Sequence, residues 1–300
     1  MPKAVLAGLK KYPVNLSVVS TVLDLGGSAG RLRQAFNTGI SFGDIRRAAL
    51  ALSEADTATK NYFNYRDWDG HVVANVFCTA MAVATGSPET AIIKLTERLK
   101  VPSQHQILPA TLDDANIYAV LENGRIIEGE RDIDIPKHNG NLKIKQVYLK
   151  PQAQAYPKAL SAIKSADLIV IGPGDLYSSL AHILLVKGIP KAIKKSKAKK
   201  VYICNLMTKH GETNNFTVSD FASEIEKLLG KPLDFVIYNT KKPPIQRLAL
   251  YKKEHPELLE MVENKTANAK LIGRDVITSF GSIVHDSNKL AKVILELCKV

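Results

Sequence analysis

Residues suited to phosphate binding gather in three glycine-rich segments of this 300-residue chain. The segments read DLGGSAGRLR over residues 24–33, IGPGDLYSS over residues 171–179 and NLMTKHGETNNF over residues 205–216. Glycine lets backbone amides approach an anion, serine and threonine donate hydrogen bonds, and arginine can hold a phosphate through two parallel hydrogen bonds. This combination predicts a phosphorylated ligand, while each segment taken alone is also compatible with a tight structural turn.

Each segment follows a run of apolar, β-branched residues that has the length of a strand. We predict strands at residues 16–25, 167–172, 201–208 and 233–240. Because these runs are almost continuously apolar, they are typical of parallel strands that are covered on both faces. Ligands of open parallel sheets bind beyond the carboxyl ends of the strands, and all three segments belong to that edge. We therefore expect an α/β fold with a mostly parallel sheet.

Helices are predicted between the strands. Apolar residues recur at helical spacing after Gly43, and Ser87 is a capping residue followed by proline at the first helical position. The segment 108–150 differs, because Asn123-Gly124 between two strand-like runs is a strong hairpin signal. We predict an antiparallel β insert at about 108–150 within one domain that covers residues 1–300.

Composition restricts the cellular setting and the partners. The longest apolar stretch, residues 72–86, is too short and too polar to span a membrane, so we expect a buried helix there and a cytoplasmic protein. Cys78, Cys204 and Cys298 form no CxxC pair and are expected to be buried free thiols. Much of the net charge of +12 lies in residues 187–200, which form either a solvated helix face or a surface that attracts anions. No aromatic residues accompany these lysines in a nucleic-acid-binding motif, so we do not expect nucleic acid as a partner.

Two pairs of side chains could add to the chemistry of the segments. His71 and Asn75 are four residues apart on a predicted helix and share a face. His71 is either a capped or hydrogen-bonded histidine at the start of that helix or a residue that contacts a ligand. Asp24 and Asp44 lie near glycines at the same sheet edge, where they could hold Mg²⁺ or stabilise turns. The sequence contains no GxxxxGK[ST] or GxGxxG motif, which argues against a P-loop kinase and a nicotinamide dehydrogenase. A serine hydrolase is not expected, because the sequence places no histidine for a serine-nucleophile triad.

These segments resemble the CofD-like superfamily and, within it, the YvcK branch of gluconeogenesis factors, also called the UPF0052 type. The resemblance covers about residues 9–297, and the matching motifs in chain order are DLGGSAGRLR, GDIRRAALAL, HVVAN, ILPAT, ENGRIIEGE, ADLIVIGPGDLY, NLMTKHGET and HDSNKLA. It implies a Rossmann-like three-layer α/β fold, which agrees with the strands predicted from the apolar runs.

The resemblance implies two alternative functions. The YvcK branch is associated with binding UDP-sugars such as UDP-N-acetylglucosamine and with cell shape, envelope growth and central carbon metabolism. CofD itself is a 2-phospho-L-lactate transferase. We therefore expect a nucleotide-sugar-binding regulator without covalent chemistry; the alternative is a Mg²⁺-dependent transferase of phosphorus-containing groups, with Asp24 or Asp44 at the metal. Non-specific anion binding by residues 187–200 is a third hypothesis, and a homo-oligomer is compatible with each.

The chain departs from the family pattern at several positions. Family members begin with a strand and a GGGTG-type loop ahead of the helix that here reads AVLAGLKKY, so we expect such a segment to be encoded upstream of Met1. Leu25 replaces a second aspartate, and Ala74 replaces a glycine. Asp175 replaces a small hydroxyl residue, and its charge would repel a phosphate unless a metal bridged the two or the side chain turned away.

The candidate ligand-binding residues come from the three segments and the two side-chain pairs, and no catalytic residue is predicted. They are Gly26, Gly27, Ser28, Gly30, Arg31, Arg33, Asp44, His71, Asn75, Gly172, Pro173, Gly174, Tyr177, Ser178, Asn205, Thr208, Gly211, Glu212 and Thr213.

Overall fold

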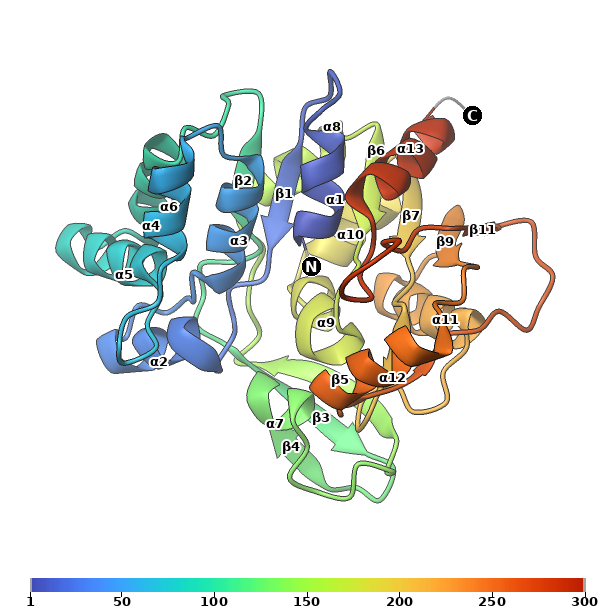
Figure 1. Cartoon of the computed structure of the whole chain (residues 1–300). Helices are drawn as coiled ribbons and strands as arrows, with labels where there is room; N and C mark the ends of the chain where they lie inside the picture. The colour runs from blue at the N-terminus through green and yellow to red at the C-terminus, as the bar shows by residue number, and fades with distance from the viewer. Residues whose placement is uncertain (1, 299–300) are drawn as a thin grey trace.

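The computed structural model describes residues 2–298, and most of its strands belong to two parallel groups that lie side by side (Figure 1). One group is a four-stranded sheet in the order β11-β9-β7-β6, and the other is the pair β1-β2. The strands are β1 (Ser17–Ser20), β2 (Gln106–Pro109), β6 (Leu168–Ile171), β7 (Lys199–Ile203), β9 (Phe235–Asn239) and β11 (Leu271–Arg274). The predicted α/β fold with a mostly parallel sheet is confirmed. Four predicted runs overlap β1, β6, β7 and β9, whereas β2 and β11 were not predicted.

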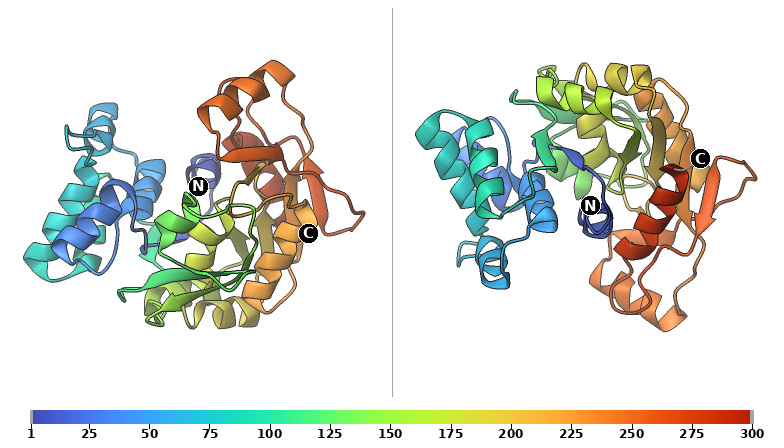
Figure 2. Two further views of the ribbon diagram at one scale, coloured as in Figure 1. Left: turned by 90° about the horizontal axis from the view of Figure 1, so that it is seen from below. Right: turned by 90° about the horizontal axis from the view of Figure 1, so that it is seen from above.

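Helices cover both faces of the parallel strands, which explains why the strand sequences are almost continuously apolar (Figure 2). On one face, α1 (Pro2–Leu9) packs against α13 (Ser287–Cys298). On the other face, α8 (Pro157–Ser165) packs against α10 (Ile189–Lys195), and α10 in turn contacts α11 (Val218–Leu229). The strands are thus the middle of three layers.

The lysine-rich run of residues 187–200 forms α10 and the lead-in to β7. Ile189 and Ile193 are buried against the sheet, whereas Lys191 and Lys194 are exposed. The predicted solvated helix face is therefore confirmed as the structural role of this run.

A helical lobe is inserted between β1 and β2. It contains α2 (Gly27–Phe36), α3 (Gly43–Leu52), α4 (Thr57–Asn64), α5 (Val73–Thr85) and α6 (Pro88–Arg98). The Ser87 hydroxyl accepts a hydrogen bond from the Thr90 amide at 3.1 Å, so the predicted cap of α6 is present. The helix predicted at 72–86 is α5, but it is buried on one face only, because Val76 and Val83 are exposed.

The predicted antiparallel insert is a three-stranded sheet in the order β4-β3-β5. Its elements are β3 (Asn116–Leu121), β4 (Ile126–Glu128), the short helix α7 (Glu130–Asp134) and β5 (Ile144–Lys150). Gly124 adopts a positive φ of 85° in the turn between β3 and β4, as the Asn-Gly signal predicts. The insert begins later than predicted, because residues 108–109 belong to the parallel strand β2.

The remaining elements extend the carboxyl edge of the four-stranded sheet. They are the π-helical turn η1 (Leu176–Leu180), α9 (Ala181–Leu184), β8 (Met207–Lys209), α12 (Ile245–Glu254) and β10 (Leu258–Met261). β8 and β10 pair antiparallel.

The environment of the cysteines corrects one prediction. Cys78 and Cys204 are buried, and burial raises the pKa of both thiols. Cys298 is exposed near the end of α13, so the prediction of three buried thiols was wrong at this position.

Among residues 2–298, no helix combines the length and the apolar character needed to cross a membrane.

Candidate functional site

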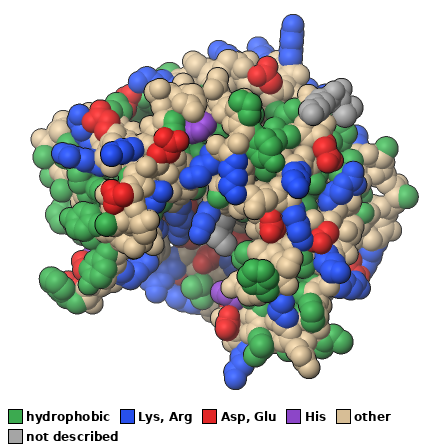
Figure 3. All heavy atoms as spheres, turned by 45° about the horizontal axis from the view of Figure 1, so that its top comes forward, with side chains coloured by type: hydrophobic (Ala, Val, Ile, Leu, Met, Phe, Trp, Pro, Cys, Tyr) green, Lys and Arg blue, Asp and Glu red, His purple; other side chains and the backbone are tan. Residues whose placement is uncertain are grey.

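A cavity of about 1760 Å³ lies between β1 and β6 and extends to the loops at the carboxyl ends of these strands. Figure 3 shows a hollow between the two sides of the molecule, bordered by Lys and Arg side chains. The predicted site residues that line the cavity are Asp44, Gly172, Pro173, Gly174 and Asn205. Arg47, which was not predicted, lines it as well. The second glycine-rich segment and Asp44 therefore do converge at one edge.

The first glycine-rich segment forms the start of α2. Gly26 is the residue before this helix, and no side chain caps the helix amides there. A Cβ atom at Gly30 would lie 2.1 Å from the backbone of Leu25, so only glycine allows the helix to fold back so closely on the loop. Uncapped amides at a helix N-terminus carry partial positive charge and can bind an anion. This turn is therefore both structural and suited to phosphate.

Ser28 joins the first segment to the predicted His71–Asn75 pair. Its hydroxyl oxygen accepts hydrogen bonds from the Val72 amide at 3.0 Å and from Asn75 Nδ2 at 3.1 Å, and His71 Nδ1 lies 3.4 Å away. His71 precedes α5, whereas Asn75 lies in its first turn, so the two residues are not on one helix face as predicted. The side-chain amide oxygen of Asn75, Oδ1, is buried and has no hydrogen-bond partner in the described part of the chain. Such an atom calls for a donor, which a ligand or water would supply.

Three carboxylates lie near the first glycine-rich segment. Burial, together with the charges of Asp44 and Glu130, raises the pKa of Asp24 to about 7. Burial and the charge of Asp134 likewise raise the pKa of Glu130 to about 7, against the opposing effect of the Leu25 and Gly26 amides. These two groups change charge near neutral pH, so the electrostatic potential at this loop depends on pH.

Oxygen ligands of this kind suit Mg²⁺. Within residues 2–298, no group donates a hydrogen bond to the Asp24 carboxylate, and one Glu130 oxygen is also buried without a partner. Asp44 is partly committed, because its carboxylate accepts a hydrogen bond from Arg47 Nη1 at 2.5 Å. Among the described residues, only Asp134, Asp175 and Glu212 bring three such ligand atoms within 4.8 Å of one another. An ion beside Asp24 would therefore be held by fewer than three of the carboxylates of Asp24, Asp44 and Glu130, and it would reduce their negative charge.

Glu212 ties the third segment to the second. Its carboxylate accepts hydrogen bonds from the backbone amides of Tyr177 and Ser178 at 3.0 and 3.1 Å, and from the Ser178 hydroxyl at 2.7 Å. Glu212 and Ser178 are almost fully buried. An internal carboxylate therefore occupies the amides of η1, which the sequence analysis assigned to a phosphate. We assign Tyr177, Ser178 and Glu212 to the framework that shapes the loop.

Lys209 neutralises the acidic residues around this contact. Its ammonium forms ion pairs with Asp134, with Asp175 at 3.3 Å and with Glu212 at 3.2 Å. Carboxylate oxygens of these three acids lie within 4.8 Å of one another, a spacing that a metal ion could use, but the ammonium sits among them. Burial alone would lower the pKa of Lys209, yet the three carboxylates outweigh it and raise that pKa. The charge of Asp175 is thereby balanced without a metal.

Other predicted residues lie in the framework. Arg33 is 4% exposed, donates to the carbonyl oxygens of Gly39, Leu23 and Ala115 and to Asp114, and does not line the cavity. Arg31 is exposed and donates to the Asp69 carbonyl oxygen at 2.7 Å.

The third segment is held in place by its own contacts. The Thr208 hydroxyl bonds to the backbone of Glu260, and the Thr213 hydroxyl accepts from the Lys209 amide at 2.9 Å. Gly211 packs against Pro136, where a Cβ atom would come within 2.6 Å of the ring. Of the predicted residues in this segment, only Asn205 lines the cavity.

The role of α7 was not predicted from the sequence. Glu130 at its start lies beside Gly26, with 3.3 Å between Glu130 Oε2 and a Cβ atom built on that glycine. Asp134, one helical turn later, pairs with Lys209. The insert therefore places Glu130 at the first glycine-rich segment and Asp134 where the second and third segments meet. The four-residue spacing of these acids was the available signal.

Comparison with known proteins agrees with this architecture. A family profile described as 2-phospho-L-lactate transferase CofD matches residues 3–279. The "Gluconeogenesis factor" of Bacillus subtilis is 34% identical over 98% of this chain and 94% of its own. The "Putative gluconeogenesis factor" of Thermotoga maritima is 37% identical over 96% of this chain and 93% of its own. A relative of the same name from Nostoc sp. is 39% identical over 97% of this chain, which spans only 65% of that protein.

A solved structure is also similar. The crystal structure of a UPF0052 family protein from Bacillus halodurans superposes with a TM-score of 0.90 at 33% identity. The match covers 98% of this chain and 95% of that one.

Proposed function

Because the chain belongs to the CofD family, and within it to the gluconeogenesis-factor group, we propose that it binds a nucleotide-sugar such as UDP-N-acetylglucosamine. The observation that carries the proposal is the uncapped start of α2, which lies beside the start of α3, because a Cβ atom on Gly43 would be 3.3 Å from Ala29 Cβ and 3.4 Å from Asp24 Oδ2. Asp44 and Arg47 of α3 line the cavity together with Gly172 and Gly174. Helix amides and an arginine would bind the diphosphate, and the cavity would accept the base or the sugar.

The proposed role is regulatory. In this role the bound state, rather than a covalent reaction, would link nucleotide-sugar supply to cell shape, envelope growth and central carbon metabolism. The many internal contacts of the second and third segments support this proposal, because they leave few side chains free for catalysis.

Ligand-induced stabilisation tests the proposal. A ligand at a hundred times its Kd stabilises a protein by about 2.7 kcal/mol, which a thermal melt detects. We expect UDP-N-acetylglucosamine to raise the melting temperature, and Arg47→Gln to weaken binding about tenfold through loss of a charged donor. Arg98→Gln, at the exposed end of α6, serves as the matched control and should bind as the wild type does. A melting temperature unchanged by millimolar ligand would contradict the proposal.

A transferase remains the second candidate because of one observation. Asp24 lies within electrostatic range of Asp44 and Glu130 near the first glycine-rich segment, and a Mg²⁺-dependent phosphoryl-type transfer uses carboxylates to hold its metal. Mg²⁺-dependent turnover of a phosphodiester donor that is lost in Asp24→Asn would favour this candidate. Ligand binding without turnover in Mg²⁺ would favour the regulator.

A further inference from the structure

The outer side of α5 is apolar although it is turned toward solvent. Between Val73 and Ala84, every residue that is exposed or half-buried is apolar, whereas the polar residues Asn75 and Thr79 are only 2% and 4% exposed. At 3.6 residues per turn, these apolar residues share one side of the helix. We call this surface the α5 face, and it consists of Val73, Val76, Phe77, Ala80, Met81, Val83 and Ala84.

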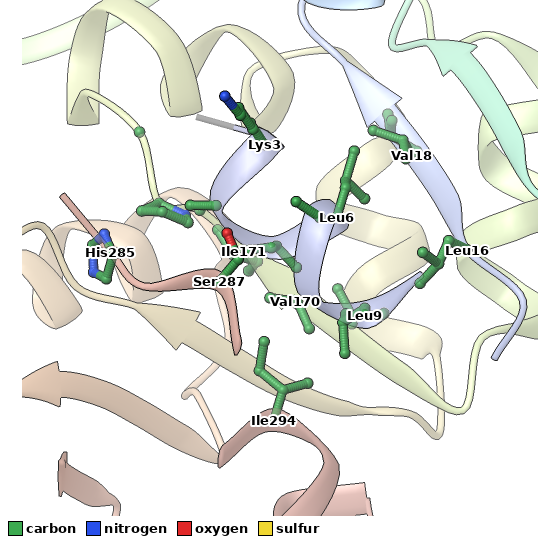
Figure 4. Close-up of a pocket in the computed structure, with 18 of the residues that line it drawn as sticks. Lys3, Leu6, Leu9, Leu16, Val18, Val170, Ile171, His285, Ser287 and Ile294 are labelled. Atoms are coloured by element: carbon green, nitrogen blue, oxygen red, sulfur yellow. The ribbon is translucent and has the colours of Figure 1, made fainter. Parts of the chain in front are cut away.

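The composition of α5 is that of a buried helix. A surface helix normally turns charged side chains to water and its apolar side to the core. α13 follows this rule, because Ile294 points toward Val170 of β6 while Lys292 and Glu296 are exposed (Figure 4). α5, in contrast, contains no charged residue. Such a helix is normally buried on all sides, so the α5 face calls for a cover that residues 2–298 of one chain do not supply.

α4 continues the apolar surface beyond α5. The ring of Phe63 contacts the rings of Phe77 and Tyr62 edge to face, with 5.6 and 5.4 Å between the ring centres, and Tyr62 is 62% exposed. Figures 1 and 2 show α5 at the outer end of the helical lobe, on the side away from the four-stranded sheet. An apolar surface of this kind, with exposed aromatic side chains beside it, is typical of a protein–protein or membrane contact.

The charge pattern favours a second copy of the chain as the partner. A helix that lies on a membrane carries lysine or arginine beside its apolar side, and α5 carries neither. An acidic protein would likewise be recognised through basic side chains. Two copies of this chain each have a formal charge of +12 and repel one another, so they can meet most easily through a surface without charged side chains.

The ends of α5 indicate an antiparallel pairing. The first turn has no acidic residue, the last turn has no basic residue, and Val72 provides no side-chain cap. The partial charges at the two helix ends are therefore not compensated within α5. A two-fold axis near Ala80 would place the start of each helix beside the end of the other, so opposite partial charges would meet. Ala80 and Ala84 are small, which lets the two helix axes approach closely.

We propose that the α5 face is the interface of a symmetric homodimer, in which α5 packs antiparallel against α5 of a second copy. Tyr62 of α4 lies at the edge of this interface. Residues 73–85 line no part of the cavity between β1 and β6, so the dimer does not depend on the proposed ligand.

Sedimentation velocity over the micromolar range tests the proposal. We expect the wild type to sediment as a reversible dimer. Ala80→Glu brings two carboxylates together at the two-fold axis, and we expect it to raise the dimer dissociation constant by about a hundredfold. Ala249→Glu makes the same change at an exposed position of α12 and should sediment as the wild type does. Ala80 is exposed in the single chain, so the variant should fold, which circular dichroism checks.

Cross-linking locates the axis independently. Cys78 and Cys204 are buried and Cys298 is exposed, so a Cys298→Ser background leaves no exposed thiol among residues 2–298. In this background we expect Ala80→Cys to form a disulfide-linked dimer on mild oxidation, whereas Ala249→Cys should not.

Four outcomes would overturn the proposal. A dimer retained by Ala80→Glu would mean that the copies meet elsewhere, and a dimer lost in Ala249→Glu alone would place the interface on α12. A monomeric wild type that sediments with phosphatidylserine-containing vesicles would mean that a membrane covers the α5 face. A monomeric wild type that does not bind the vesicles would mean that a different protein covers it. None of these measurements involves UDP-N-acetylglucosamine, so they are independent of the test of the proposed function.

Discussion

Ser28 holds the start of α2 against the start of α5 through one hydroxyl oxygen. Two donors reach this oxygen, the Val72 amide and Asn75 Nδ2, and the side chains of Ser28 and Asn75 are buried. A buried donor that loses its acceptor keeps the full cost of leaving water. The hydroxyl therefore contributes more to stability than an exposed serine does.

Replacement of this hydroxyl is the first prediction. Ser28→Ala leaves two buried donors without an acceptor, and we expect it to lower the free energy of unfolding by about 1–3 kcal/mol. Urea unfolding measures the change. Ser165→Ala removes an exposed hydroxyl from the last turn of α8 and should change stability by less than about 0.5 kcal/mol. Equal effects of the two substitutions would show that the buried Ser28 hydroxyl contributes no more to stability than an exposed hydroxyl does.

Glu130 predicts a pH dependence of stability. Its pKa is raised from 4.5 to about 7 in the folded protein, so the folded state holds the proton more tightly than the unfolded state does. The stabilisation is fully present below about pH 4.5 and is lost as the pH rises through about 7. We expect Glu130→Gln to flatten the decline in unfolding free energy between pH 5 and 8 by about 1–3 kcal/mol.

Urea unfolding at several pH values measures this difference. Glu97→Gln, an exposed substitution on α6, should leave the decline as in the wild type. If Glu130→Gln showed the same decline in unfolding free energy as the wild type, the pKa of Glu130 would not be raised by burial.

At the scale of elements, α7 and the Glu212 loop fix the carboxyl edge. α7 belongs to the antiparallel insert, yet its two ends reach different glycine-rich segments through Glu130 and Asp134. Glu212 then holds the amides of η1 from β8's side. The insert is therefore part of the scaffold of the site rather than an appendage.

Lys209 carries a prediction at this scale. Lys209→Met leaves the carboxylates of Asp134, Asp175 and Glu212 close together without a positive charge. We expect the free energy of unfolding to fall by about 3–5 kcal/mol, because removing one member of a buried ion pair leaves the charges of its partners uncompensated. Millimolar Mg²⁺ should recover part of the loss, because the ammonium no longer occupies the space among the oxygen atoms.

Thermal melts with and without Mg²⁺ measure both effects. Lys252→Met removes a more exposed ion pair on α12 and should cost less than about 1 kcal/mol. A mild effect of Lys209→Met would indicate that the three acids are not held together by its charge.

The start of α2 offers a comparison of two glycines. A Cβ atom at Gly30 would lie 2.1 Å from the Leu25 backbone, whereas one at Gly27 would meet nothing within 4 Å. Gly27 has a φ of +56°, so alanine there costs only about 1 kcal/mol of backbone strain. We expect Gly30→Ala to destabilise the protein by several times that amount, as calorimetry can measure. A comparable cost at the two positions would contradict the close approach of loop and helix.

At the scale of the whole molecule, sequence patterns predicted more of the fold than of the site. Continuous apolar runs located β1, β6, β7 and β9, because two-sided burial leaves a direct mark on sequence. β11 was not predicted, because its sequence LIGR is short. Part of β2 was assigned to the antiparallel insert, because its apolar residues lie next to the insert in the sequence. Side-chain partners left no such mark. Arg33 and Glu212 have the composition of phosphate-site residues, but contacts distant in the sequence commit them to the framework.

Net charge adds a prediction about association kinetics. The chain carries a formal charge of +12, and a positive field attracts anionic ligands at long range. We expect the combined substitution of Lys191, Lys194 and Lys195 by glutamine to slow UDP-N-acetylglucosamine association about two- to threefold at low salt. Dissociation should be unchanged, because these lysines lie on α10 and do not line the cavity. Stopped-flow measurements separate the two rates, and a faster dissociation would place the lysines in contact with the ligand.

The most direct measurement of the central claim is a calorimetric titration with UDP-N-acetylglucosamine. At pH 6 in EDTA, Asp24 and Glu130 are mostly protonated, since their pKa values are about 7. We predict saturable one-to-one binding there, weaker binding at pH 8 in EDTA, and recovery at pH 8 when Mg²⁺ neutralises the carboxylates. A flat titration under all three conditions would contradict the assignment of this cavity to a nucleotide-sugar.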